Sequence, residues 1–168
     1  RRAERVNRLE APVYACRGNH EYLGGEAREK GFIRQTKIQL LQDSVATFED
    51  KLYIIGRDDA TNRRRRSLRE LTAGLDRTRP ILLLDHQPHR LEEAEQAGID
   101  LQLSGHTHRG QVVPINLIVD QLYERSHGYH RRGATQYYVS SGIGIWGGKY
   151  RIGTQSEYAV ITLRPQSN

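Results

Sequence analysis

Short apolar runs separated by polar turns divide the chain into predicted strands. The runs with strand-like length and composition are 12–16, 38–41, 45–48, 52–55, 81–84, 99–103, 137–139 and 158–163. Residues 81–84 are apolar throughout, as in strands that are buried on both faces of a sheet. Ile99, Leu101 and Leu103 instead alternate with polar residues. The pattern therefore predicts a sheet with fully buried and half-exposed strands.

Helical spacing is confined to short segments between these runs. The predicted helices cover 1–9, 26–30 with Gly31 as its end, a segment that begins at Leu68, and 91–97 with Gly98 as its end. Ser67 and Glu70 form a capping-box pattern before the third of these helices. The middle of the chain has βαβ character and the ends look antiparallel. We therefore expect residues 1–168 to form one mixed α/β layered domain.

Charge adds one feature to this picture. The 168 residues contain 26 Lys and Arg against 20 Asp and Glu, which gives a net charge of +6. The run Arg63–Arg66 precedes the helix predicted at Leu68, where the helix dipole disfavours cations. The run is therefore either a solvated loop or a loop that attracts phosphate groups. Aromatic residues do not interleave with it, so nucleic acid is not an expected partner, although a basic nucleic-acid module stays a third hypothesis.

Several protein classes are excluded by composition. One cysteine, Cys16, cannot build a disulfide framework or a Cys-rich zinc module, and we expect it to be buried in a strand. No apolar run approaches the roughly 20 residues of a membrane span, and no signal peptide opens the chain, so we expect the chain itself to be soluble. It begins at Arg1 and contains no methionine. We interpret it as a processed or excised piece of a longer protein.

Histidines placed directly after three predicted strands carry the strongest chemical signal. The three loops read Gly18-Asn19-His20-Glu21, Asp85-His86-Gln87-Pro88-His89 and Ser104-Gly105-His106-Thr107-His108. In open α/β sheets, ligands bind in the crevice beyond the carboxyl ends of the strands. Imidazole, amide and carboxylate groups together suit divalent Mn, Fe, Zn or Ni. The His-x-His spacing can serve one ion or two neighbouring ions.

Other candidate residues carry weaker signals. His127 and His130 are expected to be solvated loop side chains, and His89 could be either solvated or functional. The segment Gly142–Gly147 matches G-x-G-x-x-G, but no βαβ unit follows it. We therefore interpret it as a glycine-rich turn.

These histidine blocks resemble the calcineurin-like metallophosphoesterase family. That family carries, in order, D-x-H, G-D-x-x-D, G-N-H-D/E, a lone His and G-H-x-H. The last three are present here as Gly18-Asn19-His20-Glu21, His86 and Gly105-His106-Thr107-His108, and the first two are absent. Residues 101–111 and 138–144, with Arg151 before Glu157, are similar to a bacterial and often membrane-anchored branch. Many members of that branch have Gly at the position of Arg109.

The resemblance implies a fold and a division of labour among these residues. The fold would be a layered α-β-β-α sandwich, with its N-terminal strands absent from this chain, so that 1–168 is one truncated domain. Asn19, His86 and His106 would bind the second of two divalent metals, and His108 the first. His20 would act on the scissile phosphate as proton donor or charge stabiliser, with Glu21 orienting it. His89 and Arg109 are candidate substrate-binding residues.

The function implied is that of a metal-dependent phosphoesterase, a phosphatase or phosphodiesterase whose hydroxide is activated by two metals. Since the missing blocks supply the bridging Asp, we expect the fragment to be impaired and its parent to be active. The alternative is a non-catalytic domain that binds metal or phosphate. The branch also implies that the parent protein is membrane-associated through its N-terminal part.

Overall fold

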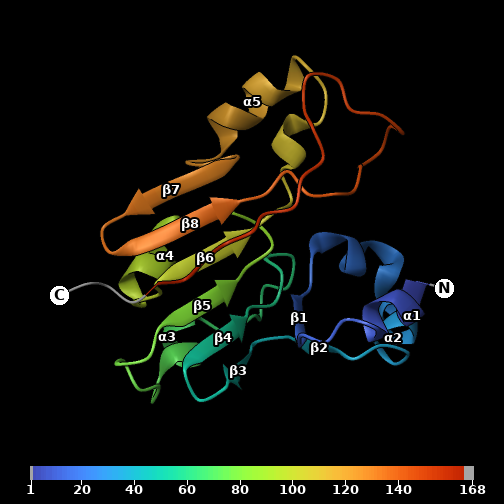
Figure 1. The fold of residues 1–168 in the computed structure, drawn as a ribbon. Helices are drawn as coiled ribbons and strands as arrows, with labels where there is room; N and C mark the ends of the chain where they lie inside the picture. The colour runs from blue at the N-terminus through green and yellow to red at the C-terminus, as the bar shows by residue number, and fades with distance from the viewer. Residues whose placement is uncertain (1, 165–168) are drawn as a thin grey trace.

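The computed structural model describes residues 2–164 and contains a six-stranded sheet (Figure 1). Its strand order is β3-β4-β5-β6-β8-β7. The strands are β3 (Ser44–Phe48), β4 (Leu52–Gly56), β5 (Ile81–Leu84), β6 (Leu101–Ser104), β7 (Gly128–Arg132) and β8 (Thr135–Val139). The four central strands are parallel, whereas β3 and β7 pair antiparallel at the two edges. The expected parallel middle is confirmed, and antiparallel pairing is found at β3–β4 and β7–β8, but the N-terminal strands of the chain pair in parallel, so the expectation of antiparallel ends is wrong there.

A second, two-stranded sheet comes from the N-terminal part of the chain. Its strands β1 (Val13–Cys16) and β2 (Ile38–Leu41) are parallel and are accompanied by α1 (Arg2–Asn7), η1 (Glu21–Gly25) and α2 (Glu26–Ile33) (Figure 1). β2 contacts β3 and β4 of the larger sheet. At this contact Gly56 lies so near Leu41 that any side chain at position 56 would overlap it.

The hydrophobic core lies between the six-stranded sheet and the helices α3 (Leu68–Thr72) and α4 (Leu91–Gln96). Ile55, Leu83 and Tyr137 supply the sheet side of this core, and the Tyr137 hydroxyl donates to the carbonyl of Leu91 at 2.7 Å. The predicted capping box begins α3, because the Ser67 side chain accepts from the Glu70 N–H while Glu70 accepts from Ser67. The mixed α/β fold with flanking helices is thus as predicted.

The structure corrects the predicted end of one helix and removes one predicted strand. The helix expected to end at Gly31 continues to Ile33, because the Gln35 side chain donates to the Gly31 carbonyl and Thr36 donates to the carbonyl of Ile33. The strand expected over 158–163 is not formed. A strand needs a paired neighbour, and no strand within residues 2–164 pairs with this segment. Tyr158 and Val160 are accordingly 82% and 83% exposed.

β7 and the helix α5 (Ile115–Leu122) are among the elements that were not predicted. β7 is rich in polar residues, and it forms because the two-residue turn Gly133–Ala134, with Gly133 at a φ of 56°, folds it back on β8. The helix α5 has an apolar sequence but no buried residue. None of the helices within residues 2–164 has both the length and the apolar character needed to cross a membrane.

Candidate metal centre

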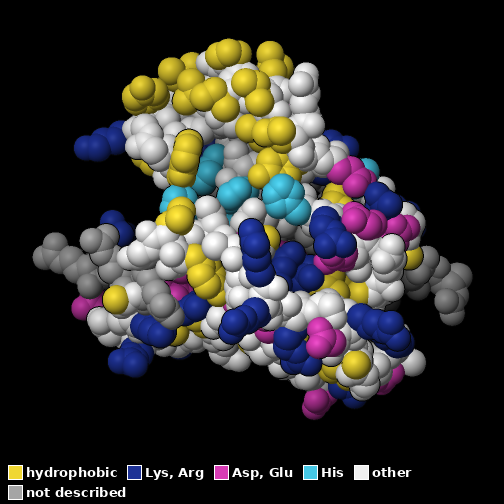
Figure 2. Space-filling view, turned by 180° about the vertical axis from the view of Figure 1, so that it is seen from behind, with side chains coloured by type: hydrophobic (Ala, Val, Ile, Leu, Met, Phe, Trp, Pro, Cys, Tyr) yellow, Lys and Arg dark blue, Asp and Glu magenta, His cyan; other side chains and the backbone are white. Residues whose placement is uncertain are grey.

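Three loops that follow β1, β5 and β6 bring together three atoms of types that can bind a metal ion. The Asn19 Oδ1 atom lies 3.1 Å from His86 Nε2 and 3.1 Å from His106 Nδ1. The two histidine nitrogens lie 3.3 Å apart. His86 and His106 follow β5 and β6, which are neighbours in the six-stranded sheet, whereas Asn19 follows β1 of the two-stranded sheet. Figure 2 shows the histidine side chains grouped on one face of the molecule.

The chemistry of this donor set fits a divalent ion. Ligands bound at about 2.0–2.1 Å lie roughly 3 Å apart when they are separated by right angles, close to the spacing found here. Two imidazole nitrogens and one amide oxygen are donors that borderline divalent metals accept. Within residues 2–164 no group of three or more His, Cys, Asp or Glu side chains could hold a metal ion. The amide of Asn19 is what completes the trio.

Gly18 makes the approach of His86 to Asn19 sterically feasible. A Cβ atom at position 18 would lie 2.9 Å from His86 Nε2. The Gly18 N–H donates to the Glu21 carboxylate at 2.9 Å, which closes the loop that carries Asn19. Glu21 therefore contacts the backbone of its own loop, whereas the expected role was to orient His20. His20 is exposed at this site and interacts electrostatically with His86.

The histidines of the trio are held in the neutral form. Burial lowers the pKa of His86, and it lowers the pKa of His106 to about 4 with help from neighbouring His86. The carboxylate of Asp59 opposes this trend at both rings. Since only neutral imidazole has a lone pair for a metal, the site is set to bind a cation at neutral pH.

The loop from His106 to Gln111 is held in a strained backbone conformation. His106, His108, Arg109 and Gln111 have φ values of 69°, 48°, 51° and 57°, in the left-handed region that residues with side chains seldom adopt. The buried Thr107 hydroxyl anchors the loop by donating to the Ser126 carbonyl and accepting from the Arg109 N–H. Strain of this kind persists only where the surrounding structure enforces it, and it often marks functional sites.

His108 lies beside the trio but not within it. Arg151 donates to His108 Nδ1 at 3.3 Å and to its carbonyl at 3.1 Å. Burial and the charge of Arg151 lower the pKa of His108. Arg151 also donates to the carbonyls of Ser141, Gly142 and Gly144, so the predicted glycine-rich turn is fastened to the histidine loop.

His89 and Arg109, the two candidate substrate-binding residues, have different surroundings. The ring of His89 stacks on Tyr123 with centroids 4.7 Å apart, and Tyr123 meets His106 edge-on. Arg109 lines a separate cavity of about 450 Å³ together with His127 and Glu157. His127 is bound to Glu157 at 3.1 Å, so it is not the freely solvated side chain that was expected.

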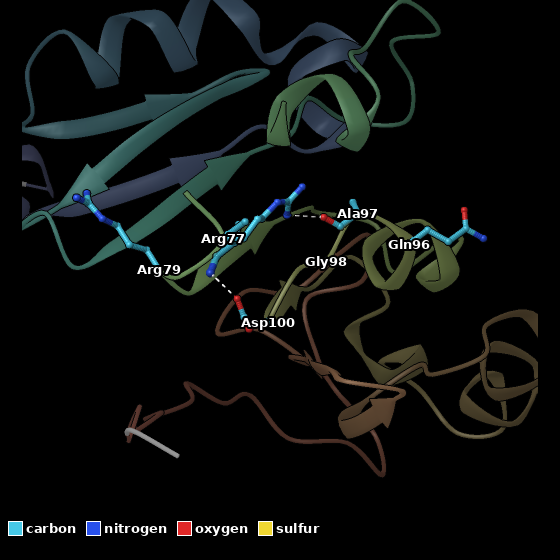
Figure 3. Close-up of a pocket in the computed structure, with 7 residues that line it drawn as sticks. Arg77, Arg79, Gln96, Ala97, Gly98 and Asp100 are labelled. Carbon is cyan, nitrogen blue, oxygen red and sulfur yellow. Dashed lines mark hydrogen bonds between the residues drawn. The ribbon is translucent and has the colours of Figure 1, made fainter. Parts of the chain in front are cut away.

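A second cavity, of about 340 Å³, lies at the opposite ends of β5 and β6, where the chain enters these strands (Figure 3). Arg77 donates across it to the Ala97 carbonyl, and Asp100 accepts from the Ile81 N–H. These polar groups hold the strand ends together. The cavity is remote from the histidines, so it does not take part in their chemistry.

Buried acidic residues beneath the histidine loops were missed by the sequence analysis. Asp59 accepts hydrogen bonds from Gln87 and Thr61, and these outweigh the effect of burial and lower its pKa. Asp85 lies between Arg57 and Arg65, but burial dominates and raises its pKa to about 6. In the sequence, the position of Asp85 directly before His86 was the feature that could have indicated a buried carboxylate near the site.

The basic run is only partly a solvated loop. The side chain of Arg65 turns inward to Asp85 and to the Asp58 carbonyl, whereas Arg63 and Arg64 are exposed. The charge at position 65 therefore compensates a buried carboxylate.

Comparison with known proteins gives consistent matches. The family model of calcineurin-like phosphoesterases matches residues 1–110. An uncharacterized metallophosphoesterase from Helicobacter pylori J99 is 35% identical over 89% of this chain and 42% of its own length. One from Aquifex aeolicus is 27% identical over 99% of this chain and 67% of its own length. A zebrafish (Danio rerio) protein named transmembrane protein with metallophosphoesterase domain is 32% identical over 90% of this chain and 38% of its own length.

The chain spans about two fifths of the length of most of these relatives. No solved structure matches it significantly. The matched region contains all three histidine loops and the trio formed by Asn19, His86 and His106. By its family match and by its motifs, the chain belongs to the calcineurin-like phosphoesterase family.

Proposed function

We propose that this chain is the metal-binding part of a hydrolase that cleaves phosphomonoesters or phosphodiesters with the help of divalent cations. The observation that carries the proposal is the convergence of Asn19, His86 and His106 from three loops within 3.3 Å of one another. Membership in the family supports the same reaction class. Mn, Fe, Zn and Ni are the cations that suit these donors.

Each residue has a role in the proposed reaction. Divalent ions at this site would activate a water as nucleophile and neutralise charge on the phosphoryl oxygens. His20, exposed beside the trio, donates a proton to the leaving oxygen or stabilises negative charge on the phosphate. Glu21 fixes the loop that carries both His20 and Asn19. His108, held by Arg151, supplies a further ligand, and His89 and Arg109 contact the substrate.

A second candidate function is metal or phosphate binding without catalysis. Two metals held close together need a bridging carboxylate. The buried carboxylates near the histidines are already engaged, Asp59 by Gln87 and Thr61 and Asp85 by two arginines. This observation favours an impaired fragment, whose parent supplies the missing group.

We further propose that the whole protein is membrane-associated. The relatives from Danio rerio and Bos taurus are named as transmembrane proteins with a metallophosphoesterase domain. The sequence similarity to them supports the same placement for the parent of this chain.

Metal titration separates the roles of the histidines. In isothermal titrations with Mn²⁺ or Zn²⁺, His86→Ala and His106→Ala should abolish binding to the chain. In a chain extended upstream, both variants should also lose hydrolysis of an aryl phosphodiester. His20→Ala should bind metal normally and lose roughly 10²–10⁴ in rate. Normal metal binding by His106→Ala would refute the site, and loss of metal in His20→Ala would refute the role of His20.

A further inference from the structure

An exposed apolar surface lies next to the histidine loops. Its six principal side chains, which we name the apolar cap, come from α5 and from the 143–152 loop: Ile115, Leu117, Ile118, Leu122, Trp146 and Tyr150. Leu117, Ile118 and Trp146 are about 60% exposed and Leu122 is 68% exposed. Figure 2 shows the hydrophobic side chains gathered at one end of the molecule, directly above the histidines. Monomeric soluble proteins seldom expose apolar patches of this extent without a function.

Hydrogen bonds connect the two segments that form the cap. The Gln111 side chain accepts from the Trp146 N–H and donates to its carbonyl, and the Val113 N–H donates to the Ile152 carbonyl. α5 follows directly at Ile115. The cap is therefore a fixed surface formed by two segments.

The helix presents its apolar residues outward. Ile115, Ile118 and Leu122 recur at helical spacing and all are exposed, and α5 has no buried residue at all. A helix with this orientation gains nothing from the core of its own domain. It resembles helices that lie in the interface of a lipid bilayer with their apolar side facing the acyl chains.

Aromatic residues and charge favour a lipid surface over a protein partner. Trp146 and Tyr150 are the residue types that concentrate at membrane interfaces, and Lys149 lies beside them. The segments 105–123 and 141–153 carry Arg109, Lys149 and Arg151 against the single acidic residue Asp120, which is hydrogen-bonded to Ser126. The whole chain has a net charge of +6. The cap is convex in Figure 2, which suits a bilayer better than a groove-filling peptide.

We propose that the apolar cap docks the protein on an anionic phospholipid bilayer, with α5 and Trp146 inserted at the interface. Docked in this way, the histidine loops lie beside the lipid headgroups. The docking does not depend on the proposed phosphoester chemistry, since it uses side chains outside the metal-binding trio.

Trp146 is the only tryptophan of the chain, and it therefore reports on docking directly. Vesicles of phosphatidylcholine and phosphatidylglycerol (7:3) should shift its emission to shorter wavelength, and brominated lipids should quench it. Vesicles of phosphatidylcholine alone, or 0.5 M NaCl, should weaken binding several-fold because charge attraction is lost or screened. Absence of both the shift and the quenching with anionic vesicles would overturn the proposal.

A double substitution tests the surface itself. Leu117→Glu with Ile118→Glu should reduce the vesicle partition coefficient about tenfold or more, because two charges replace apolar contacts with lipid. Leu9→Glu is the matched control, since Leu9 is 51% exposed outside the cap, and it should bind as the parent chain does. Equal binding by the double variant would overturn the proposal. The proposal would also be overturned if the parent chain failed to bind vesicles but dimerised with increasing concentration, and if the double variant did not dimerise.

Discussion

At the scale of single residues, the arrangement of Asn19, His86 and His106 depends on the lack of a side chain at position 18. The His86 ring occupies the space that a side chain on Gly18 would fill. Asn19, next in sequence, gains its contact with His86 through this close approach. The glycine of the loop is therefore a requirement of ligand geometry.

Gly18→Ala should weaken metal binding much more than it weakens the fold. The added methyl group would stand 2.9–3.0 Å from three atoms of the His86 ring and would push the ring away from Asn19. We expect at least a tenfold loss of Mn²⁺ or Zn²⁺ affinity by calorimetry, of the size seen when metal-supporting contacts are removed. Unchanged affinity would mean that His86 is not a ligand.

Cys16 should be nearly inert in the folded protein. Burial, assisted by the nearby charge of Asp85, raises the pKa of its thiol to about 12. At pH 8 the reactive thiolate is then about 10³ times rarer than in the unfolded chain. Alkylation of the half-buried Cys16 by iodoacetamide should be slower by a similar factor in the absence of urea than in its presence, and similar rates would contradict the raised pKa of the thiol.

The raised pKa of the Cys16 thiol also makes the free energy of unfolding depend on pH. The folded state keeps the thiol proton up to about pH 12, while the unfolded chain releases it near its ordinary value of 9. Stability from this group is therefore complete below about pH 9 and declines as the pH rises above it.

At the scale of elements, two glycines that look alike in the sequence behave oppositely. Gly31 lies inside α2 with open space around its Cα, whereas Gly56 ends β4 against Leu41. Gly31→Ala should raise the free energy of unfolding by about 0.5–1 kcal/mol, because alanine favours the helical backbone. Gly56→Ala should lower it by about 1–3 kcal/mol through overpacking. Urea denaturation of both variants checks the pair, and a destabilised Gly31→Ala would contradict the helix through 31.

Elements were predictable where the signal is local. Strands before the histidine loops were recognised because apolar runs precede two of the loops and an alternating apolar pattern precedes the third. The rule that ligands gather at strand ends predicted one shared site, whereas the grouping of Asn19, His86 and His106 came from the family resemblance. The burial of Asp58 and Asp59 was not predictable, because their partners Tyr22, Gln42 and Gln87 come from distant segments. The strand predicted at 158–163 shows the same limit, since a run of apolar residues does not supply a neighbouring strand to pair with.

At the scale of the whole molecule, the two sheets differ in how well they can stand alone. The six-stranded sheet carries the core beneath α3 and α4, whereas β1 and β2 form a pair of only four residues each. Amide hydrogen exchange should therefore be slowest in β5, β6 and β8 and clearly faster in β1 and β2, because two-stranded sheets are marginal without support. Equal protection of both sheets would indicate a single cooperative unit.

The metal-binding trio is divided between these two sheets. Asn19 follows β1, while His86 and His106 follow β5 and β6. An ion bound by all three residues would therefore link the six-stranded sheet to the two-stranded sheet. Part of its binding free energy would stabilise the contact between the two sheets. Removal of the ion by a chelator would then also allow the N-terminal sheet to separate from the six-stranded sheet or to unfold independently. The concentration of free metal would set how stable the contact between the two sheets is.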